Sequence, residues 1–180
     1  MLKRFKELWQ NLGVKKAPQF ERVVATIGQE HFVIRELTTE DIKELIEVQR
    51  AVYSGSLPWA RSAFVSELVS PLSHLYLCAE KEQEIVAFCG CRIIGEDGHV
   101  TNVAVLPEFQ GVGVGTFLLQ QVEDFAKKRG CRTMSLEVRL SNRDAQRLYR
   151  KLGYVSRAIK EAYYDESNED ALDMVKYLEE

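Results

Sequence analysis

Three glycines at alternate positions, Gly111, Gly113 and Gly115, lie between an apolar run that stops at Pro107 and an amphipathic run that begins at Phe117. The order predicted by this pattern is strand, glycine loop and helix. Glycine allows the backbone to approach a ligand closely, and a helix N-terminus carries partial positive charge. We therefore expect the loop to bind phosphate or pyrophosphate through backbone N–H groups.

The residues around the glycines show which known kinds of phosphate-binding loop this sequence can match. A Walker loop requires a lysine and then Ser or Thr after its last glycine, but Gly115 is followed directly by Thr116, which excludes this kind. A dinucleotide-binding loop requires G-x-G-x-x-G, and its third glycine is missing here. Glu137 does lie near the distance of a ribose-binding acid, so a nucleotide-dependent dehydrogenase stays open as an alternative. A tight strand-to-helix turn without a ligand is also compatible with the glycines alone.

Two side chains that could transfer protons follow the loop. Residues 131–140 alternate apolar and polar side chains, which predicts a strand with one apolar face, and Glu137 lies on its polar face. Tyr149 lies on the apolar stripe of the next predicted helix, where its ring can be buried while its hydroxyl faces a cleft. Asn142 precedes that helix as a cap. A solvent-exposed glutamate and a core tyrosine are the simpler interpretations when these residues are considered alone.

The rest of the chain predicts the elements that must position these residues. Strands are expected at residues 31–37, 75–81, 85–94, 99–105, 131–140, 154–164 and 171–178, and helices at 38–56, 60–69, 117–130 and 142–152. The order is β-α-α-β-β-β-α-β-α-β-β, with a break between the first two helices at residues 57–59. We expect an α/β (α+β mixed) fold, in which a mixed sheet of about seven strands is flanked by helices. A three-strand meander before the glycine loop disfavours a dinucleotide-binding domain.

Length and composition place further limits on function. The chain has 180 residues and a net charge of −3, so one domain is expected and no global attraction to nucleic acid. No run approaches membrane-spanning length, and no membrane partner is expected. Four cysteines lie among apolar residues without zinc-site spacing, which indicates buried reduced thiols, no metal and a cytoplasmic location.

The first 30 residues differ in character from the remainder. Residues 1–12 place Leu2, Phe5, Leu8, Trp9 and Leu12 on one side of a possible helix that is otherwise basic. Such a helix could lie on a membrane, but packing on its own domain or self-association with a second copy is favoured. Residues 15–30 are interpreted as a linker. The expected organisation is an extension over 1–30 and one domain over 31–180.

Several segments in sequence order resemble the GNAT superfamily of N-acetyltransferases, over roughly residues 32–178. Within it the chain is similar to the bacterial ribosomal-protein-alanine N-acetyltransferases. The segments are Val103-Ala104-Val105, Gln110-x-x-Gly113-x-Gly115, Leu136-Glu137-Val138-Arg139-x-Ser141-Asn142 and Ala145-x-x-Leu148-Tyr149-x-x-Leu152-Gly153-Tyr154, with Pro58-Trp59 before them and Tyr163-Tyr164 after them.

The resemblance implies direct acetyl transfer from acetyl-CoA to an amine, without a metal. It makes Glu137 the general base, through a water molecule, and Tyr149 the general acid toward the leaving thiolate. It assigns Asn142 to the pantetheine arm, and the strand backbone at Val103, Ala104 and Val105 to the thioester carbonyl. The residues implied for the pyrophosphate are Gln110, Gly111, Val112, Gly113, Val114, Gly115 and Thr116, and those implied for the peptide groove are Pro58, Trp59, Tyr163 and Tyr164.

The resemblance also carries expectations about affinity and acceptor. Relatives usually have Arg or Lys at the positions of Gly111 and Thr116, so we expect weaker cofactor affinity here. The implied acceptor is the N-terminal α-amine of a protein, with alanine first and a ribosomal protein as the candidate. An acidic stretch over residues 161–173 could attract a basic N-terminus. A lysine or small-molecule amine acetyltransferase and a non-catalytic acyl-CoA-binding module stay open as alternatives.

Overall fold

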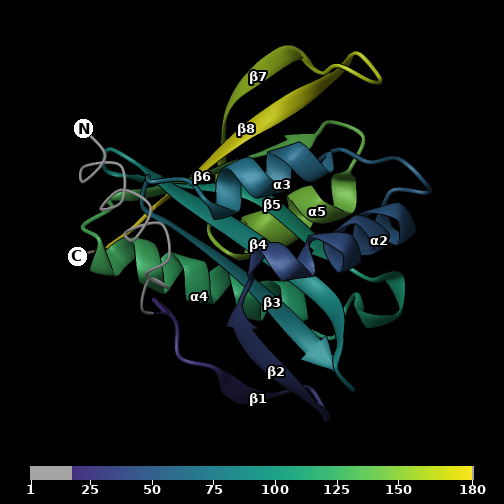
Figure 1. Ribbon diagram of the computed structural model, residues 1–180. Helices are drawn as coiled ribbons and strands as arrows, with labels where there is room; N and C mark the ends of the chain where they lie inside the picture. The colour runs from purple at the N-terminus through teal and green to yellow at the C-terminus, as the bar shows by residue number, and fades with distance from the viewer. Residues whose placement is uncertain (1–17, 180) are drawn as a thin grey trace, which may run out of the picture.

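The computed structural model describes residues 18–179, which form one mixed sheet with helices on both faces (Figure 1). The sheet has eight strands in the spatial order β1-β2-β3-β4-β5-β6-β8-β7. The strands are β1 (Val23–Ile27), β2 (Glu30–Glu36), β3 (His74–Lys81), β4 (Glu84–Ile94), β5 (Asp97–Val105), β6 (Thr133–Arg139), β7 (Val155–Tyr164) and β8 (Glu169–Tyr177). The helices are α2 (Ile42–Val52), α3 (Arg61–Leu68), α4 (Val114–Lys128) and α5 (Arg143–Lys151), with short 3-10 turns at Thr39–Asp41 and Pro107–Phe109.

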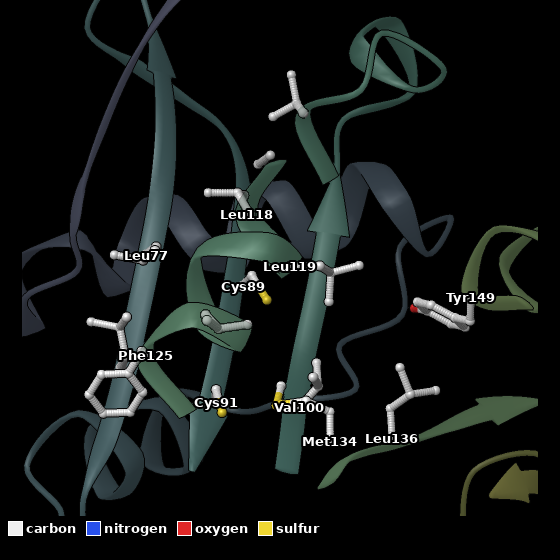
Figure 2. Close-up of a cluster of buried hydrophobic side chains, with 14 of the residues drawn as sticks. Leu77, Cys89, Cys91, Val100, Leu118, Leu119, Phe125, Met134, Leu136 and Tyr149 are labelled. Carbon is white, nitrogen blue, oxygen red and sulfur yellow. The ribbon is translucent and has the colours of Figure 1, made fainter. Parts of the chain in front are cut away.

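The two faces of the sheet bury separate apolar clusters. On one face, α4 packs its buried stripe against β3, β4 and β5, and burial of such a stripe is the main favourable term in folding. Figure 2 shows this cluster, with Leu118, Leu119 and Phe125 facing Leu77 and Cys89. On the opposite face, α2 and α3 bury Leu45 and Phe64 against Phe88 and Ala104.

The feature that creates the site is the divergence of β5 from β6. These two strands are parallel neighbours, but they pair only from Asp97–Thr133 to His99–Ser135. Beyond His99, β5 continues to pair with β4, with a register shift between Gly90 and Cys91, and β6 continues to pair with β8. The carboxyl-terminal halves of β5 and β6 therefore lose their shared hydrogen bonds and leave a gap between them.

The fold class and the expected element order are confirmed, with one strand added. Residues 23–27 form β1 and pair with β2, although residues 15–30 were expected to be a linker. The expectation of about seven strands is thus low by one. The strand is short, and Val23 and Val24 face solvent, so it has no apolar alternation that a pattern could reveal.

Other expectations have mixed outcomes. All four cysteines are free and buried, as expected. The basic amphipathic helix and self-association predicted at residues 1–12 lie outside the described residues. Within residues 18–179, no helix is long and apolar enough to cross a membrane. Over the same residues there is no cluster of three or more His, Cys, Asp or Glu side chains able to hold a metal ion.

Candidate active site

A pocket fills the gap between the diverging halves of β5 and β6. Its walls come from β5 on one side, β6 on the other, the end of α2 with the segment before α3, the start and middle of α5, and the end of β7. The lining residues are Tyr53, Pro58, Trp59, Val100, Thr101, Asn102, Val103, Leu136, Glu137, Val138, Arg139, Asn142, Tyr149 and Tyr164. The structure thus brings together seven of the residues predicted from the sequence: Pro58, Trp59, Val103, Glu137, Asn142, Tyr149 and Tyr164.

Glu137 is the carboxylate of the pocket and has two basic neighbours. Its Oε1 accepts a hydrogen bond from Lys160 Nζ at 2.5 Å, and its Oε2 lies 3.1 Å from His99 Nε2. Burial alone would raise the pKa of Glu137. The hydrogen bonds and charges of His99 and Lys160 outweigh burial and lower that pKa to about 2. Glu137 is therefore ionised at neutral pH.

His99 links Glu137 to a further carboxylate along the sheet. Its Nδ1 lies 2.8 Å from Ser135 Oγ, and Ser135 donates its hydroxyl hydrogen to Asp97. Thr133 also donates to Asp97, with an oxygen–oxygen distance of 2.7 Å. These residues share a face because alternate side chains of a strand point the same way, and His99 and Ser135 are direct register partners.

Tyr149 lies on the buried side of α5 and lines the same pocket as Glu137. Its ring reaches toward β5 in Figure 2 and packs at the edge of Tyr154, with centroids 5.9 Å apart. Burial raises the pKa of Tyr149, so its phenol keeps its proton at neutral pH. Asn142 caps α5, since its Oδ1 accepts a hydrogen bond from Ala145 N at 3.1 Å. Capping does not remove Asn142 from the pocket wall.

The segment between α2 and α3 is held in place by one buried glutamine. Gln49 Nε2 donates to Trp59 O at 2.9 Å, and Trp59 N donates to Gln49 Oε1 at 3.1 Å. Gln49 is fully buried, and the Trp59 ring packs on Phe64 at a centroid distance of 5.3 Å. This two-way hydrogen bond fixes Pro58 and Trp59 at the pocket rim.

The hairpin of β7 and β8 supplies the opposite rim. The guanidinium of Arg139 stacks 4.0 Å from the centroid of the Tyr164 ring and pairs with Glu169 at 3.2 Å. Burial raises the pKa of Tyr164 to about 12, although Arg139 opposes the shift. Tyr163, also predicted for the groove, does not line the pocket. It packs against Tyr164 at a centroid distance of 5.1 Å and is 44% exposed.

The glycine loop is placed at the end of β5, as expected. Gly111 and Gly113 have positive φ angles of 79° and 108°, a region that suits glycine. Gly113 is the N-cap of α4, and Phe117 N bonds back to Gly113 O at 2.9 Å. The N–H groups of residues 114–116 therefore precede the hydrogen-bond ladder of the helix, as at any helix start. Such N–H groups at the start of a helix suit an anion.

Individual residues of the glycine loop and of β5 make different structural contacts. Gly115 lies so close to β5 that an added Cβ would meet Val105 Cγ2 at 3.2 Å. The Gln110 side chain donates to Val105 O at 2.9 Å and so braces the loop against the strand. The side chain of Val114 is fully buried. The remaining predicted residues belong to the same segment, with Ala104 buried, Val112 partly buried and Thr116 in the first turn of α4.

Pattern reasoning missed nine residues of the site. Seven of them line the pocket, namely Tyr53, Val100, Thr101, Asn102, Leu136, Val138 and Arg139. The other two, His99 and Lys160, contact Glu137. Asn102 is notable because its Nδ2 is buried and has no hydrogen-bond partner among the described residues. A buried amide donor without a partner is costly, so a ligand acceptor would satisfy it. Only the tertiary structure brings these residues together, because they come from the end of α2 and from β5, β6 and β7, although Leu136, Val138 and Arg139 lie inside the Leu136–Arg139 motif.

Comparison with known proteins decides the family. The model of the acetyltransferase (GNAT) family matches residues 39–154. The chain belongs to the GNAT family. It is therefore an acetyl-CoA-dependent N-acetyltransferase, and the dehydrogenase alternative is wrong.

Relatives of this acetyltransferase share most of its length. A Bacillus subtilis protein, provisionally named a [ribosomal protein bS18]-alanine N-acetyltransferase, is 36% identical over 142 residues, which are 78% of this chain and 92% of that protein. The N-alpha-acetyltransferase RimI of Mycobacterium tuberculosis is 33% identical over 153 residues, or 83% and 94% of the two chains. The crystal structure of the ribosomal-protein-S18-alanine N-acetyltransferase from Escherichia coli superposes with a TM-score of 0.72 at 29% identity, covering 82% of this chain and 94% of that one.

The site of this acetyltransferase fits acetyl-CoA. The helix-start N–H groups and the close approach of Gly115 to β5 suit a pyrophosphate. The gap beyond His99 and Ser135 leaves the β5 backbone free of β6 on its inner edge, where an extended pantetheine arm can bond. The residues present thus match the shape and polarity of the cosubstrate.

Proposed function

We propose that this enzyme acetylates the N-terminal α-amine of a ribosomal protein, with alanine as the first residue and bS18 as the candidate. The names of relatives at 30% identity or more over most of the chain support this acceptor. The observation that carries the chemistry is the position of Glu137, an ionised carboxylate in the pocket between β5 and β6. Tyr149, a protonated phenol, lies in the wall of the same pocket.

The geometry supports one role in the reaction for each element, as follows. The start of α4 holds the pyrophosphate, and the free edge of β5 at residues 103–105 holds the thioester arm. Glu137 takes the proton of the acceptor ammonium, directly or through one water molecule, so that the nitrogen lone pair can attack the thioester carbonyl. Tyr149 gives a proton to the CoA thiolate as the carbon–sulfur bond breaks. Asn142 and Asn102 are placed to hydrogen-bond the pantetheine arm or the acceptor backbone.

The acceptor side of the pocket favours an N-terminal α-amine with a basic continuation. An α-amine has a pKa of about 8 and a lysine side chain one of about 10.4, so the α-amine loses its proton more readily at neutral pH. The β7–β8 hairpin beside the pocket carries exposed carboxylates at Glu161, Asp165 and Glu166. These charges attract a basic peptide and raise its association rate. Such a ribosomal-protein acceptor places the enzyme in the cytoplasm.

A peptide panel with acetyl-CoA tests the assignment. The panel holds peptides that begin with alanine and continue with basic residues, the same peptides with a blocked N-terminus, and lysine-bearing controls. Free CoA and product mass are both followed. We expect acetylation of free alanine termini only.

Variants link the result to the site. Glu137→Gln should lower kcat/KM by about 10²–10⁴-fold, whereas Glu96→Gln, in the exposed turn before β5, should leave it unchanged. Acetylation of blocked lysine peptides would move the assignment to lysine. If the protein binds CoA but acetylates no amine, the non-catalytic acyl-CoA-binding module would be the better assignment.

A further inference from the structure

One side chain of the pocket has a hydrogen-bond donor without a partner. Asn102 of β5 lines the pocket, and its Nδ2 is buried with no partner among residues 18–179. A buried amide nitrogen in this state costs free energy, and a ligand carbonyl would remove that cost. Because no hydrogen bond within the described chain holds this nitrogen, the amide can turn about its last side-chain torsion angle and present Nδ2 to the pocket.

An extra residue in β5 decides the face of the sheet on which Asn102 lies. Val100 and Asn102 pair with two adjacent residues of β4, so Thr101 between them has no register partner of its own. Such a β-bulge shifts the alternation of side chains by one position. Val100 belongs to the cluster under α4, and strict alternation would point Asn102 to that same face. The bulge therefore turns Asn102 to the opposite face, under α2 and α3.

The neighbours of Asn102 in β5 are consistent with this face. Thr101 Oγ1 lies 2.6 Å from the hydroxyl oxygen of Tyr76, which belongs to the cluster under α2 and α3. Val103 packs against the cluster under α4, and Ala104 again belongs to the cluster under α2 and α3. Asn102, which alternates with Val103, thus shares a face with Thr101 and Ala104.

Asn102 and Glu137 stand at the same level on this face, on opposite sides of the gap. The last pair of β5 and β6 is His99 with Ser135. Glu137 lies two residues beyond Ser135, and since Leu136 packs in the α4 cluster, Glu137 points to the other face. His99 and Asn102 pair with residues of β4 that are two positions apart. The two side chains therefore face each other across the pocket that both of them line.

We propose that Asn102 donates a hydrogen bond from Nδ2 to the carbonyl oxygen of the acceptor's first residue, and so makes the enzyme select N-terminal α-amines over lysine side chains. The inference rests on the proposed N-terminal acetylation and names the residue that recognises this acceptor. In an N-terminal residue, the amine and the carbonyl group are bonded to the same carbon atom. An amine held at Glu137 therefore brings that carbonyl close to Asn102. A lysine ε-amine has no carbonyl beside it and leaves Nδ2 unpaired.

The thioester of acetyl-CoA is the other carbonyl group that the pocket has to hold. The proposed pyrophosphate site is at the start of α4, and α4 packs on the face opposite to α2 and α3. Trp59, at the rim assigned to the peptide, packs with the cluster under α2 and α3. Because Asn102 shares the face of Trp59, the acceptor is favoured over the thioester as its partner.

A substrate analogue without the carbonyl tests this hydrogen bond in the wild-type enzyme. An alanine-first peptide is compared with its analogue in which an (E)-alkene replaces the first peptide bond, which keeps the amine and the extended shape. We expect kcat/KM to be about 10–100-fold lower for the alkene peptide, since Nδ2 is then left unpaired in the complex. Equal values for the two peptides would overturn the proposal, and this measurement needs no variant.

A variant assigns the effect to Asn102. Asn102→Leu keeps the size of the side chain and removes the amide. It should lower kcat/KM for the alanine peptide by about 10–100-fold, lower the preference over blocked lysine peptides by the same factor, and treat the alkene and alanine peptides alike. CoA affinity, measured by calorimetry, should not change. Gln29→Leu, in the exposed turn between β1 and β2, is the matched amide-to-leucine control and should keep the wild-type ratio of the two peptides.

The outcomes separate this inference from the acceptor assignment. If Asn102→Leu loses the same factor on both peptides, the proposal is overturned, and a bond to the thioester carbonyl or a packing role would replace it. Failure of the acceptor assignment looks different. In that case the wild-type enzyme turns over neither alanine-first peptide, and both proposals are overturned together.

Discussion

Lys160 reaches across β8 to place its ammonium 2.5 Å from Oε1 of Glu137, although β7 and β6 are not neighbours in the sheet. The register shows how. Lys160 pairs with Ala171 and Glu137 pairs with Asp173, so the lysine crosses β8 diagonally. The ammonium thereby occupies an oxygen that an acceptor ammonium also needs.

Replacing Lys160 with methionine should release this oxygen. The pKa of Glu137 should rise, because Lys160 is one of the two groups that lower it. We expect KM for peptides with a free α-amine to fall about 2–5-fold, the size of one lost competing ion pair at a partly exposed site. Steady-state kinetics checks this, with Lys176→Met, which breaks the Lys176–Glu123 pair elsewhere, as the control. A rise in KM would show that Lys160 orients the carboxylate instead.

The stability of the protein should depend on Glu137 in acid. Its pKa is about 2 in the folded protein, against an ordinary value of 4.5, so its stabilising contribution is fully present above pH 4.5. The contribution is lost as pH falls toward 2 and amounts to at most about 3 kcal/mol. The difference in unfolding free energy between wild type and Glu137→Gln should therefore shrink from pH 6 to pH 3 in urea titrations. A difference that stays constant over this range contradicts the ion-pair account.

Tyr149 and Tyr154 form a matched pair for testing the general acid. Both rings are buried and they pack against each other, but only Tyr149 lines the pocket. Tyr149→Phe should lower kcat by about 10–100-fold with unchanged CoA affinity, since it removes one proton donor. Tyr154→Phe should leave kcat within about twofold. Equal losses in the two variants would indicate packing in place of proton transfer.

Alanine variants of Gly113 and Gly95 can distinguish an effect on cofactor binding from an effect of backbone strain. Both have positive φ, 108° and 61° respectively, so alanine at either position should cost about 1–2 kcal/mol of stability. Gly113 begins α4 at the proposed pyrophosphate site, whereas Gly95 lies in the turn before β5. Calorimetry should therefore show CoA affinity weakened about 5–10-fold in Gly113→Ala and unchanged in Gly95→Ala. Unchanged affinity in both would remove the start of α4 from the phosphate site.

The local sequence pattern was sufficient to predict those parts of the site that lie within a single element. Alternation over residues 133–139 predicts β6 and the polar face that holds Glu137, and the glycines predict the loop at the start of α4, because both depend on neighbours in the chain. The same locality explains the omission of β1, which exists only through its pairing with β2.

The sequence by itself determined the order of elements apart from β1, the loop chemistry and the family resemblance, since each depends on short runs of neighbouring residues. The tertiary structure decided which polar side chains meet. His99 and Glu137 are 38 positions apart, and Lys160 comes from a third strand. Their contact depends on the register of β5, β6, β8 and β7, and register is set by long-range pairing that no local period encodes.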